Sequence, residues 1–344
     1  MMPFSIITKR ANNNNKRSVD LKVRYNEYQY PFDLAELTNA YLSNPYHKQC
    51  IDIKTMNILG DGLSDDISDE LEDCTPADST VNILIKTIKD LETYGNAFWE
   101  IVSLGKTGYQ IFHIPAQTMA VSEKGFKQTV NGKVVEFSKE QVFHFKYFSP
   151  VSTVYGAPDY LPVLKSIALF EKIIAYNDNF FSNNAIPDMA LIVEGGEMTD
   201  AARYQVQRFF RDKFSGTENA HKCLYLPVKD GMKVSFQKLQ ADQKDASFME
   251  LMKQTVNDII ACHGVPPRLI SIVNQSQLGG GGETSGQMDI FMKTVILPKQ
   301  RIITGMLEEL AKKYPNMFKS DNFDFIPLAY TEEPNPLNSL LRRV

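Results

Sequence analysis

The chain has 344 residues, of which 43% are hydrophobic and 23% charged, so its composition is ordinary for a globular protein. Its length allows two subdomains or one elongated protomer with a hydrophobic core. Its formal net charge is −4 at pH 7. Proteins that hold nucleic acid tightly usually carry a basic excess, because neutralising phosphates supplies most of their affinity, so tight or sequence-specific DNA binding is disfavoured. The sequence contains no run of about 18 apolar residues, and we therefore expect no membrane-spanning helix.

The cysteines and the N-terminus both favour an intracellular setting. The first ten residues lack the apolar core of a signal peptide. The cysteines are far apart in the sequence and show no CxxC spacing, so we expect reduced thiols and neither a disulfide nor a zinc site. They are Cys50, Cys74, Cys223 and Cys262.

The N-terminal part of the chain is predicted to be an arm followed by helices. Residues 1–20 include the low-complexity tract Asn12–Asn15 and are expected to form a flexible arm. Apolar periodicity predicts helices over 33–42 and 47–59 and a third helix capped by Ser79 or Thr80. The acidic stretch 65–73 lacks the spacing of an EF-hand, so we expect a solvated loop there.

From Gly95 the hydrophobic period changes to two, which predicts strands. Asn131-Gly132 is the strongest hairpin signal among them. We therefore expect a small antiparallel sheet with helices against one face, in which His113 and His144 are satisfied histidines of the core or sheet edge rather than metal ligands. The predicted strands are 96–103, 109–114, 126–130, 134–137 and 141–147.

The second half is predicted to contain two long helices with a small module between them. Pro158 suits the first turn of a helix over 158–184. Ser247 and Glu250 form a capping box for a helix that ends at Cys262, where Gly264 can take the left-handed conformation. Between them the sequence predicts a β-α-β-β module, with strands at 189–193, 223–226 and 232–239 and a helix capped by Thr199.

A glycine-rich segment, Gly279–Gly282, follows the second long helix, and a further helix interrupted by Pro298 comes after it. The glycines suggest a phosphate-binding loop, but Glu283 follows them where that motif requires Gly-Lys-Ser/Thr. A plain disordered linker is the other alternative to a functional loop. Cys262 and His263 are adjacent on a helix and point about 100° apart, so we expect a helix-end thiol and a capping imidazole rather than a nucleophile and its base.

The order of these elements resembles the portal proteins of tailed bacteriophages, and most closely the compact portals of temperate myophages and prophages. The motifs that carry the resemblance occur in the expected order between Tyr94 and Leu310. The resemblance implies an α+β portal fold with an α/β wing, a two-helix stem, a small α/β clip, a tunnel loop and a long kinked helix. The motifs are Tyr94–Trp99, Tyr155–Leu161, Phe180–Ala185, His263–Ile270 and the Gly279–Gly282 segment.

The resemblance also implies boundaries for these parts. The wing would span 21–157, the first stem helix 158–184, the clip 185–245, the second stem helix 246–264, the tunnel loop 265–285, the long kinked helix 286–313 and a short crown-side tail 314–344.

The function implied is that of a structural, non-enzymatic ring of about twelve copies at one capsid vertex. Double-stranded DNA would pass through the ring during packaging and ejection without sequence-specific contacts. The partners implied are the terminase large subunit, the major capsid or scaffold protein and a head–tail adaptor or neck protein. The ring would be assembled in the cytoplasm of a bacterial host, would lie in the virion and would require no membrane and no cofactor.

The resemblance assigns roles to two sets of residues and to Pro298, which would mark the kink. Channel-facing residues of the tunnel loop would be Arg268, Asn274, Gln275, Gln277, Gly279, Gly280, Gly281, Gly282, Glu283 and Thr284. Arg203, Arg208, Arg211 and Lys213 would form a basic clip face that docks the motor or an adaptor, the alternative being a solvated helix surface.

Two other functions remain open from the sequence. One is a nucleic-acid-processing enzyme whose active site no motif reveals, and the other is a head or tail scaffold subunit without a DNA channel.

Overall fold

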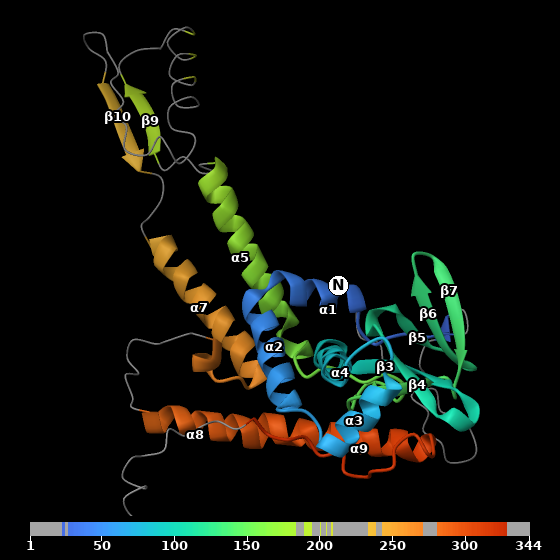
Figure 1. Ribbon diagram of the computed structural model, residues 1–344. Helices are drawn as coiled ribbons and strands as arrows, with labels where there is room; N and C mark the ends of the chain where they lie inside the picture. The colour runs from blue at the N-terminus through green and yellow to red at the C-terminus, as the bar shows by residue number, and fades with distance from the viewer. Residues whose placement is uncertain are drawn as a thin grey trace, which may run out of the picture. The chain divides into compact units, whose positions relative to one another are not determined.

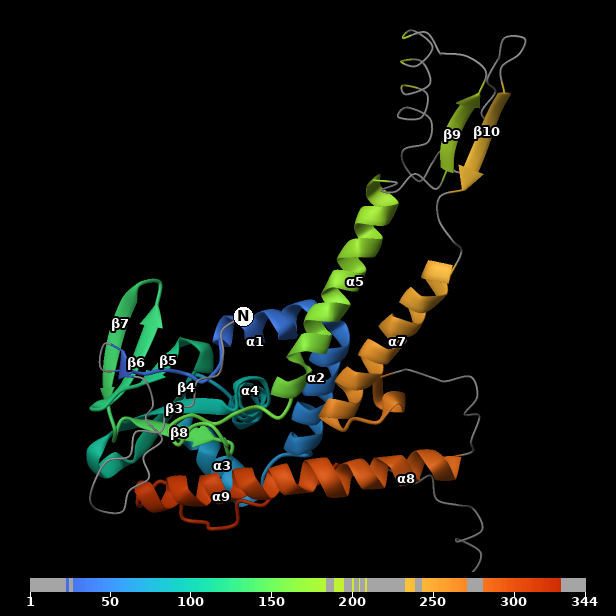
Figure 2. The ribbon, with the colours of Figure 1, turned by 180° about the vertical axis from the view of Figure 1, so that it is seen from behind.

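The computed structural model describes residues 23–24, 27–183, 189–194, 233–238, 243–270 and 281–328, together with the helical residues Asp200, Tyr204 and Arg208. The chain divides into two compact units, unit 1 with residues 1–164 and 259–344 and unit 2 with residues 165–258 (Figures 1 and 2). Across these described ranges, every helix is too short or too polar to cross a bilayer. The expected arm (1–20) lies outside the described residues.

Four helices open unit 1, and local capping chemistry sets where three of them begin. They are α1 (Leu34–Ser43), α2 (Pro45–Leu59), α3 (Asp65–Cys74) and α4 (Thr80–Tyr94). The side chains of Asp33, Asn44 and Ser79 each accept a hydrogen bond from a first-turn amide of α1, α2 and α4 respectively. The predicted helices at these positions are confirmed.

Helix α3 corrects the expectation of a solvated loop over 65–73. Its aspartates and glutamates cover the solvent side, while Ile67, Leu71 and Cys74 are buried along one stripe. An i, i+4, i+7 apolar spacing holds the helix to the core despite its charge. The acidic first turn also suits the positive end of the helix dipole.

Two three-stranded antiparallel sheets follow, where the sequence predicted one. The first has the order β4-β3-β8 and the second β5-β6-β7. The turn between β6 and β7 has positive φ at Asn131 (49°) and Gly132 (75°), as a type I′ hairpin requires. The strands are β3 (Asn96–Ser103), β4 (Tyr109–Ile114), β5 (Met119–Val121), β6 (Gly125–Val130), β7 (Lys133–Ser138) and β8 (Val142–Lys146), preceded by the short pair β1 (Val23–Arg24) and β2 (Glu27–Tyr28).

The sequence did not predict β5, because a strand of three residues is too short to show the alternation of apolar and polar residues.

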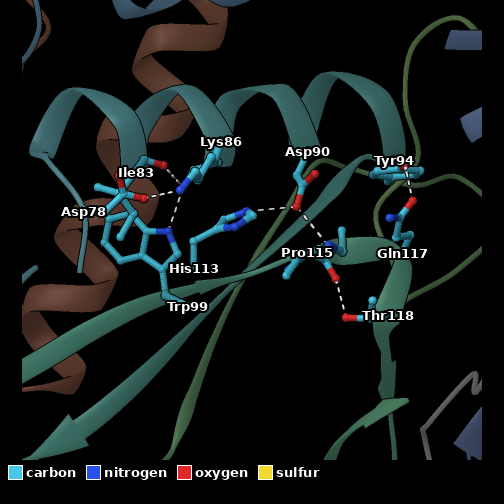
Figure 3. A network of polar contacts seen from close by, with 12 residues as sticks. Asp78, Ile83, Lys86, Asp90, Tyr94, Trp99, His113, Pro115, Gln117 and Thr118 are labelled. Atoms are coloured by element: carbon cyan, nitrogen blue, oxygen red, sulfur yellow. Dashed lines mark hydrogen bonds and ion pairs between the residues drawn. The ribbon is translucent and has the colours of Figure 1, made fainter. Parts of the chain in front are cut away.

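Helix α4 is fastened to β3 and β4 by buried polar contacts (Figure 3). The indole Nε1 of Trp99 donates to Thr87 Oγ1 at 2.6 Å. Asp90 accepts from the amide of Ala116 at 2.9 Å and lies 3.0 Å from His113 Nε2. On β8, His144 Nε2 lies 2.9 Å from Asn96 Oδ1. Both strand histidines are therefore partnered within the fold, as predicted.

Unit 2 contains parts of two long helices and a strand pair. Helix α5 (Leu164–Asn183) leads to β9 (Met189–Glu194), which pairs antiparallel with β10 (Lys233–Lys238), and α7 (Gln243–His263) follows. Within the unit, the rings of Tyr176 and Phe248 stack at 4.9 Å. The predicted strand at 223–226 and the Thr199 cap lie outside the described residues.

Both long helices begin at other residues than predicted. Helix α5 begins at Leu164 rather than Pro158, after a 3₁₀ turn at Leu161–Val163, because the residue before Pro162 is disfavoured in the α region. Helix α7 begins at Gln243, so Ser247 lies inside the helix rather than at the N-cap position that the predicted capping box requires. Residues 243–246 are Gln-Lys-Asp-Ala, and the high helix propensity of Gln, Lys and Ala extends the helix backward.

Gly95 provides a test of how closely the fold is packed behind α4. It has φ +70°, and a Cβ there would lie 2.5 Å from the backbone carbon of Ala157. We expect Gly95→Ala to lower the free energy of unfolding by roughly 2–5 kcal/mol, from backbone strain together with overpacking.

Gly132→Ala is the matched control, because Gly132 has φ +75° but nothing within 4 Å of the added Cβ. This substitution should lower the free energy of unfolding by only about 1 kcal/mol. The two free energies of unfolding are measured by urea denaturation. Equal decreases for both variants would show that backbone strain alone, without the close approach of Ala157, requires glycine at position 95.

Candidate functional site

The candidate site is the place in unit 1 where the predicted tunnel loop leaves and re-enters the fold. Helix α7 ends at His263, and Gly264, with φ +65°, turns the chain into the 3₁₀ turn Pro267–Ile270. After residues 271–280 the chain resumes as α8 (Gly281–Phe291), a π-helical turn (Met292–Ile296) and α9 (Leu297–Lys313). Both ends of the 271–280 segment therefore belong to unit 1.

The end of α7 and the π-turn are in close approach. A Cβ placed on Gly264 would lie 3.0 Å from Val295 Cγ2, which is tighter than ordinary contact. The left-handed φ of Gly264 confirms the predicted helix end, since glycine adopts this conformation without steric cost.

A π-helical turn directly precedes the first turn of α9, where the sequence predicts a kink at Pro298. The amide of Leu297 bonds to the carbonyl of Met292, five residues back, and Pro298 lies in the first turn of α9. A proline ring clashes with the carbonyl four residues before it in a regular α-helix. The wider turn removes that clash, and α8 and α9 continue each other in both views (Figures 1 and 2).

A buried cluster of charges anchors α9 to the rest of unit 1. Glu92, on α4, has a side chain that is 1% exposed and lies 2.5 Å from Lys54 Nζ and 2.6 Å from Lys299 Nζ. The hydroxyl of Tyr147 donates to the same carboxylate at 2.7 Å. Lys299 also reaches Asp159, on the segment before α5, at 2.6 Å.

The charges of this cluster stabilise one another. Burial by itself raises the pKa of Glu92, but Lys54 and Lys299 outweigh burial and lower it to about 2. Burial lowers the pKa of Lys299, whereas Glu92 and Asp159 raise it, with a net increase. Glu92 and Lys299 are therefore both charged at neutral pH, and their mutual attraction offsets part of the cost of desolvating them.

A buried histidine pair lies at the end of α7. Nδ1 of His47 is 2.8 Å from Nε2 of His263, so one neutral ring donates and the other accepts. Tyr160 packs against both rings, with its hydroxyl donating to the carbonyl of Thr93 at 2.6 Å. His263 is thus a core residue, and the expectation that it caps the helix is wrong because α2 supplies a buried partner.

These groups are arranged to hold elements together rather than to react. Burial raises the pKa of the Cys262 thiol, which is the opposite of what a nucleophile needs. Burial lowers the pKa of His47 to about 3, and the positive charge of Lys54 contributes a smaller part of this decrease. In the described part of the chain, no three His, Cys, Asp or Glu side chains gather closely enough to share a metal ion. The arrangement fixes α2, α4, α7 and α9 to one another.

Most residues predicted for the two functional segments are not brought together by the described structure. Arg268 lies half-buried in the 3₁₀ turn after α7, and Arg208 is helical and exposed. The others lie outside the described residues, namely Asn274, Gln275, Gln277, Gly279, Gly280, Arg203, Arg211 and Lys213.

The remaining four predicted loop residues are helical, which corrects the boundary of the loop. Gly281, Gly282, Glu283 and Thr284 form the start of α8, so the long helix begins at Gly281 rather than Gly286. Gly281 and Gly282 stand in the first turn of α8, whereas the full propensity cost of glycine applies to helix interiors.

The sequence contains a signal for the charge cluster. Lys54 stands between Ile51 and Ile58 on the apolar stripe of α2, and Glu92 follows Ile88 by four residues on that of α4. Charged residues at core positions of two helices indicate a buried ion pair. The partner Lys299 could not be found this way, because it is 207 residues from Glu92.

We expect Glu92→Gln to lower the free energy of unfolding by about 3–5 kcal/mol, because it leaves two buried lysines without a countercharge. Glu308→Gln is the control, since Glu308 pairs with Lys312 at 3.7 Å on the solvent side of α9. It should change stability by less than about 0.5 kcal/mol. Similar values for both variants in urea unfolding would contradict the anchoring role.

Acid should destabilise the fold through the buried histidines before the carboxylates titrate. Because the pKa values of His47 and His144 fall from 6.5 to about 3 on folding, the unfolded chain binds more protons between these values. Stability is full above pH 6.5 and declines as pH falls, by up to about 1.4 kcal/mol per pH unit for each histidine. His47→Gln should visibly reduce this slope between pH 6.5 and 5, and an unchanged slope would show that His47 is protonated in the folded protein.

The comparisons with known proteins agree with this architecture. The family model described as "Phage portal protein" matches residues 63–326. The "Probable portal protein" of Streptomyces phage phiC31 is 25% identical over 258 residues, covering 71% of this chain and 55% of the relative. The chain thus spans about half the length of this curated relative.

Solved structures show the same fold. The neck of a native gene transfer agent particle, computed with C12 symmetry, contains a chain with a TM-score of 0.67 at 18% identity, covering 91% of this chain and 89% of that one. An HK97 family phage portal protein from Corynebacterium diphtheriae gives a TM-score of 0.52 at 12% identity, covering 78% and 88%. The expected α+β portal fold is confirmed, and because the family model matches well over half of the chain, the chain belongs to the phage portal protein family.

Proposed function

We propose that copies of this chain assemble into a closed ring at one vertex of a capsid and form the channel through which double-stranded DNA is packaged and ejected. The family match over 63–326 carries this proposal, because it includes the end of α7, the segment 271–280 and the long helix that follows it. The role is structural, and no reaction is assigned to the chain. A ring of about twelve copies fits the C12 symmetry of the similar neck structure.

The parts of the fold take the following roles in this proposal. The helices α1–α4 and the two sheets form the wing, and α5 and α7 form the stem. The strands β9 and β10 belong to the clip, 185–242. The tunnel loop shortens to 265–280, because α8 begins at Gly281.

The two stem helices have suitable lengths. Helix α5 has 20 residues and α7 has 21, which at 1.5 Å per residue gives about 30 Å each. That length is enough for a collar through a thin capsid shell. Heterologous contacts between neighbouring copies close such a ring when the rotation per copy divides a full turn.

The charge of the chain suits transport of DNA more than its retention. At −4 per copy the ring is acidic overall, so the duplex meets no long basic track on which it would stop. Contacts to passing DNA would come from a few polar groups of the tunnel loop, such as Arg268, Gln275 and Gln277.

Partners are assigned by position in this proposal. The clip, with Arg203, Arg208, Arg211 and Lys213, would dock the terminase large subunit and later a neck or head–tail adaptor protein. The wing would contact the major capsid or scaffold protein. The assembled ring would reside in the virion after assembly in the cytoplasm of a bacterial host.

Negative-stain microscopy and mass photometry of the purified protein test the proposal. We expect rings with a central hole about 25 to 40 Å wide, because a B-DNA duplex with its grooves must pass through. Rings without a hole would support a scaffold subunit instead. A stable monomer with metal-dependent nuclease activity would overturn the ring and support an enzyme.

A further inference from the structure

The π-turn Met292–Ile296 separates a firmly held half of the long helix from a weakly held half. On the C-terminal side, Lys299 binds Glu92 and Asp159, and Gln300 Nε2 donates to the carbonyl of Ile58 at 2.8 Å. Further along α9, the hydroxyl of Thr304 donates to the carbonyl of Phe323 at 3.0 Å. Four other segments of unit 1 thus hold α9 in place.

Helix α8 has much less to hold it. Of its described side chains, 286–291, only Phe291 is buried, and Ile290 is 63% exposed. The hydroxyl of Thr294 bonds within the same helix, to the carbonyl of Ile290 at 2.7 Å. Local opening follows low burial and few contacts to other elements, so α8 can move at a lower cost than α9.

The π-turn itself is a weak point in the helix. A π-helical turn is rare, occurs mostly as a single turn inside an α-helix, and is frequent at functional sites. A π-turn contains one residue more than an α-helical turn. This additional residue keeps Phe291 and Ile296, which are five positions apart, on the same buried side of the helix, where both are at most 1% exposed. Pro298 prevents the turn from closing into regular α-helix, since its ring would clash with a carbonyl of the preceding turn.

The end of α7 rests against this weak point. Val295, inside the π-turn, is the side chain nearest to Gly264, where even a Cβ would come within 3.0 Å. A shift of Gly264 toward the long helix would therefore press on Val295.

We propose that the π-turn is a hinge, with α9 as its fixed arm and α8 as its moving arm, and that the contact of Gly264 with Val295 couples movement of the α7 end to α8. The hinge follows from the contacts of unit 1 alone. Its use in DNA passage rests on the proposed function, because α8 carries one end of the predicted tunnel loop.

Hydrogen–deuterium exchange of the purified full-length protein tests the hinge without reference to DNA. In the wild type, amides of 286–291 should exchange at least about tenfold faster than those of 300–310, because α8 opens without α9. Equal protection of the two segments would overturn the hinge. Ring formation is scored separately by microscopy, so absence of rings would count against the proposed function and not against the hinge.

A variant with an unbroken α-helix tests whether the π-turn causes the faster exchange at 286–291. Deleting Thr294 leaves Phe291 and Ile296 four residues apart, and adding Pro298→Ala allows an unbroken α-helix with the same buried stripe. Exchange at 286–291 should then fall to within about threefold of that at 300–310. The matched control, Thr294→Ala with Pro298→Ala, retains the extra residue and should keep the faster exchange.

If the deletion and its control exchange alike at 286–291, the π-turn is not the hinge.

A single substitution covers the case in which the deletion variant fails to fold. Val295→Ala removes the side chain beside Gly264, and it should speed exchange at 286–291 by several-fold while leaving 300–310 unchanged. No change at 286–291 would overturn the coupling to α7.

Discussion

The carboxylate of Glu92 is the group on which the arrangement of unit 1 depends. It is fully buried between Lys54 and Lys299, with the hydroxyl of Tyr147 as a third partner. An unpaired charge at this depth costs several kcal/mol, so α2, α4 and α9 must come together for any of the three charges to be tolerated. Apolar packing would stabilise the same contact without this condition. The cluster therefore enforces one position of the long helix more than it adds stability.

That constraint determines where the long helix can yield. Lys299 and Gln300 come directly after Pro298, so the fixed contacts begin within one turn of the π-turn. A hinge needs one arm that does not move, and here the charges supply it. The histidine pair fixes the other neighbour of the loop in the same way, by joining the end of α7 to α2. Both anchors use long-range polar contacts, one at the end of α7 before the segment 271–280 and the other in α9, beyond α8 and the π-turn.

Local chemistry explains how much of this fold could be predicted from the sequence. The caps at Asp33, Asn44 and Ser79 and the Asn131-Gly132 hairpin lie within a few residues of what they control. The helices and the hairpin at these positions were predicted, although only Ser79 was named as a cap. Errors arose where a local rule competed with another. The many acidic side chains of 65–73 led to the prediction of a loop, although the segment carries the apolar stripe of α3. The four glycines of 279–282 led to a predicted helix start at Gly286 rather than Gly281. The order of elements gave the family, but the anchors Glu92–Lys299 and His47–His263 join residues about 200 positions apart, which no local pattern reveals.

The position of the irregular turn relative to the charges suggests why both are present. A proline in a long helix usually marks a bend and little more. Here the π-turn keeps Phe291 and Ile296 on the buried side, so the irregularity does not alter which face of the rod meets the core. If it served packing alone, a regular helix one residue shorter would place the same two side chains on the same face. What the regular helix would lack is a place to open between the clamp at Lys299 and the exposed α8. An irregular turn that packing does not require, next to a clamp that stability alone does not require, is best explained by motion of α8 about a fixed α9.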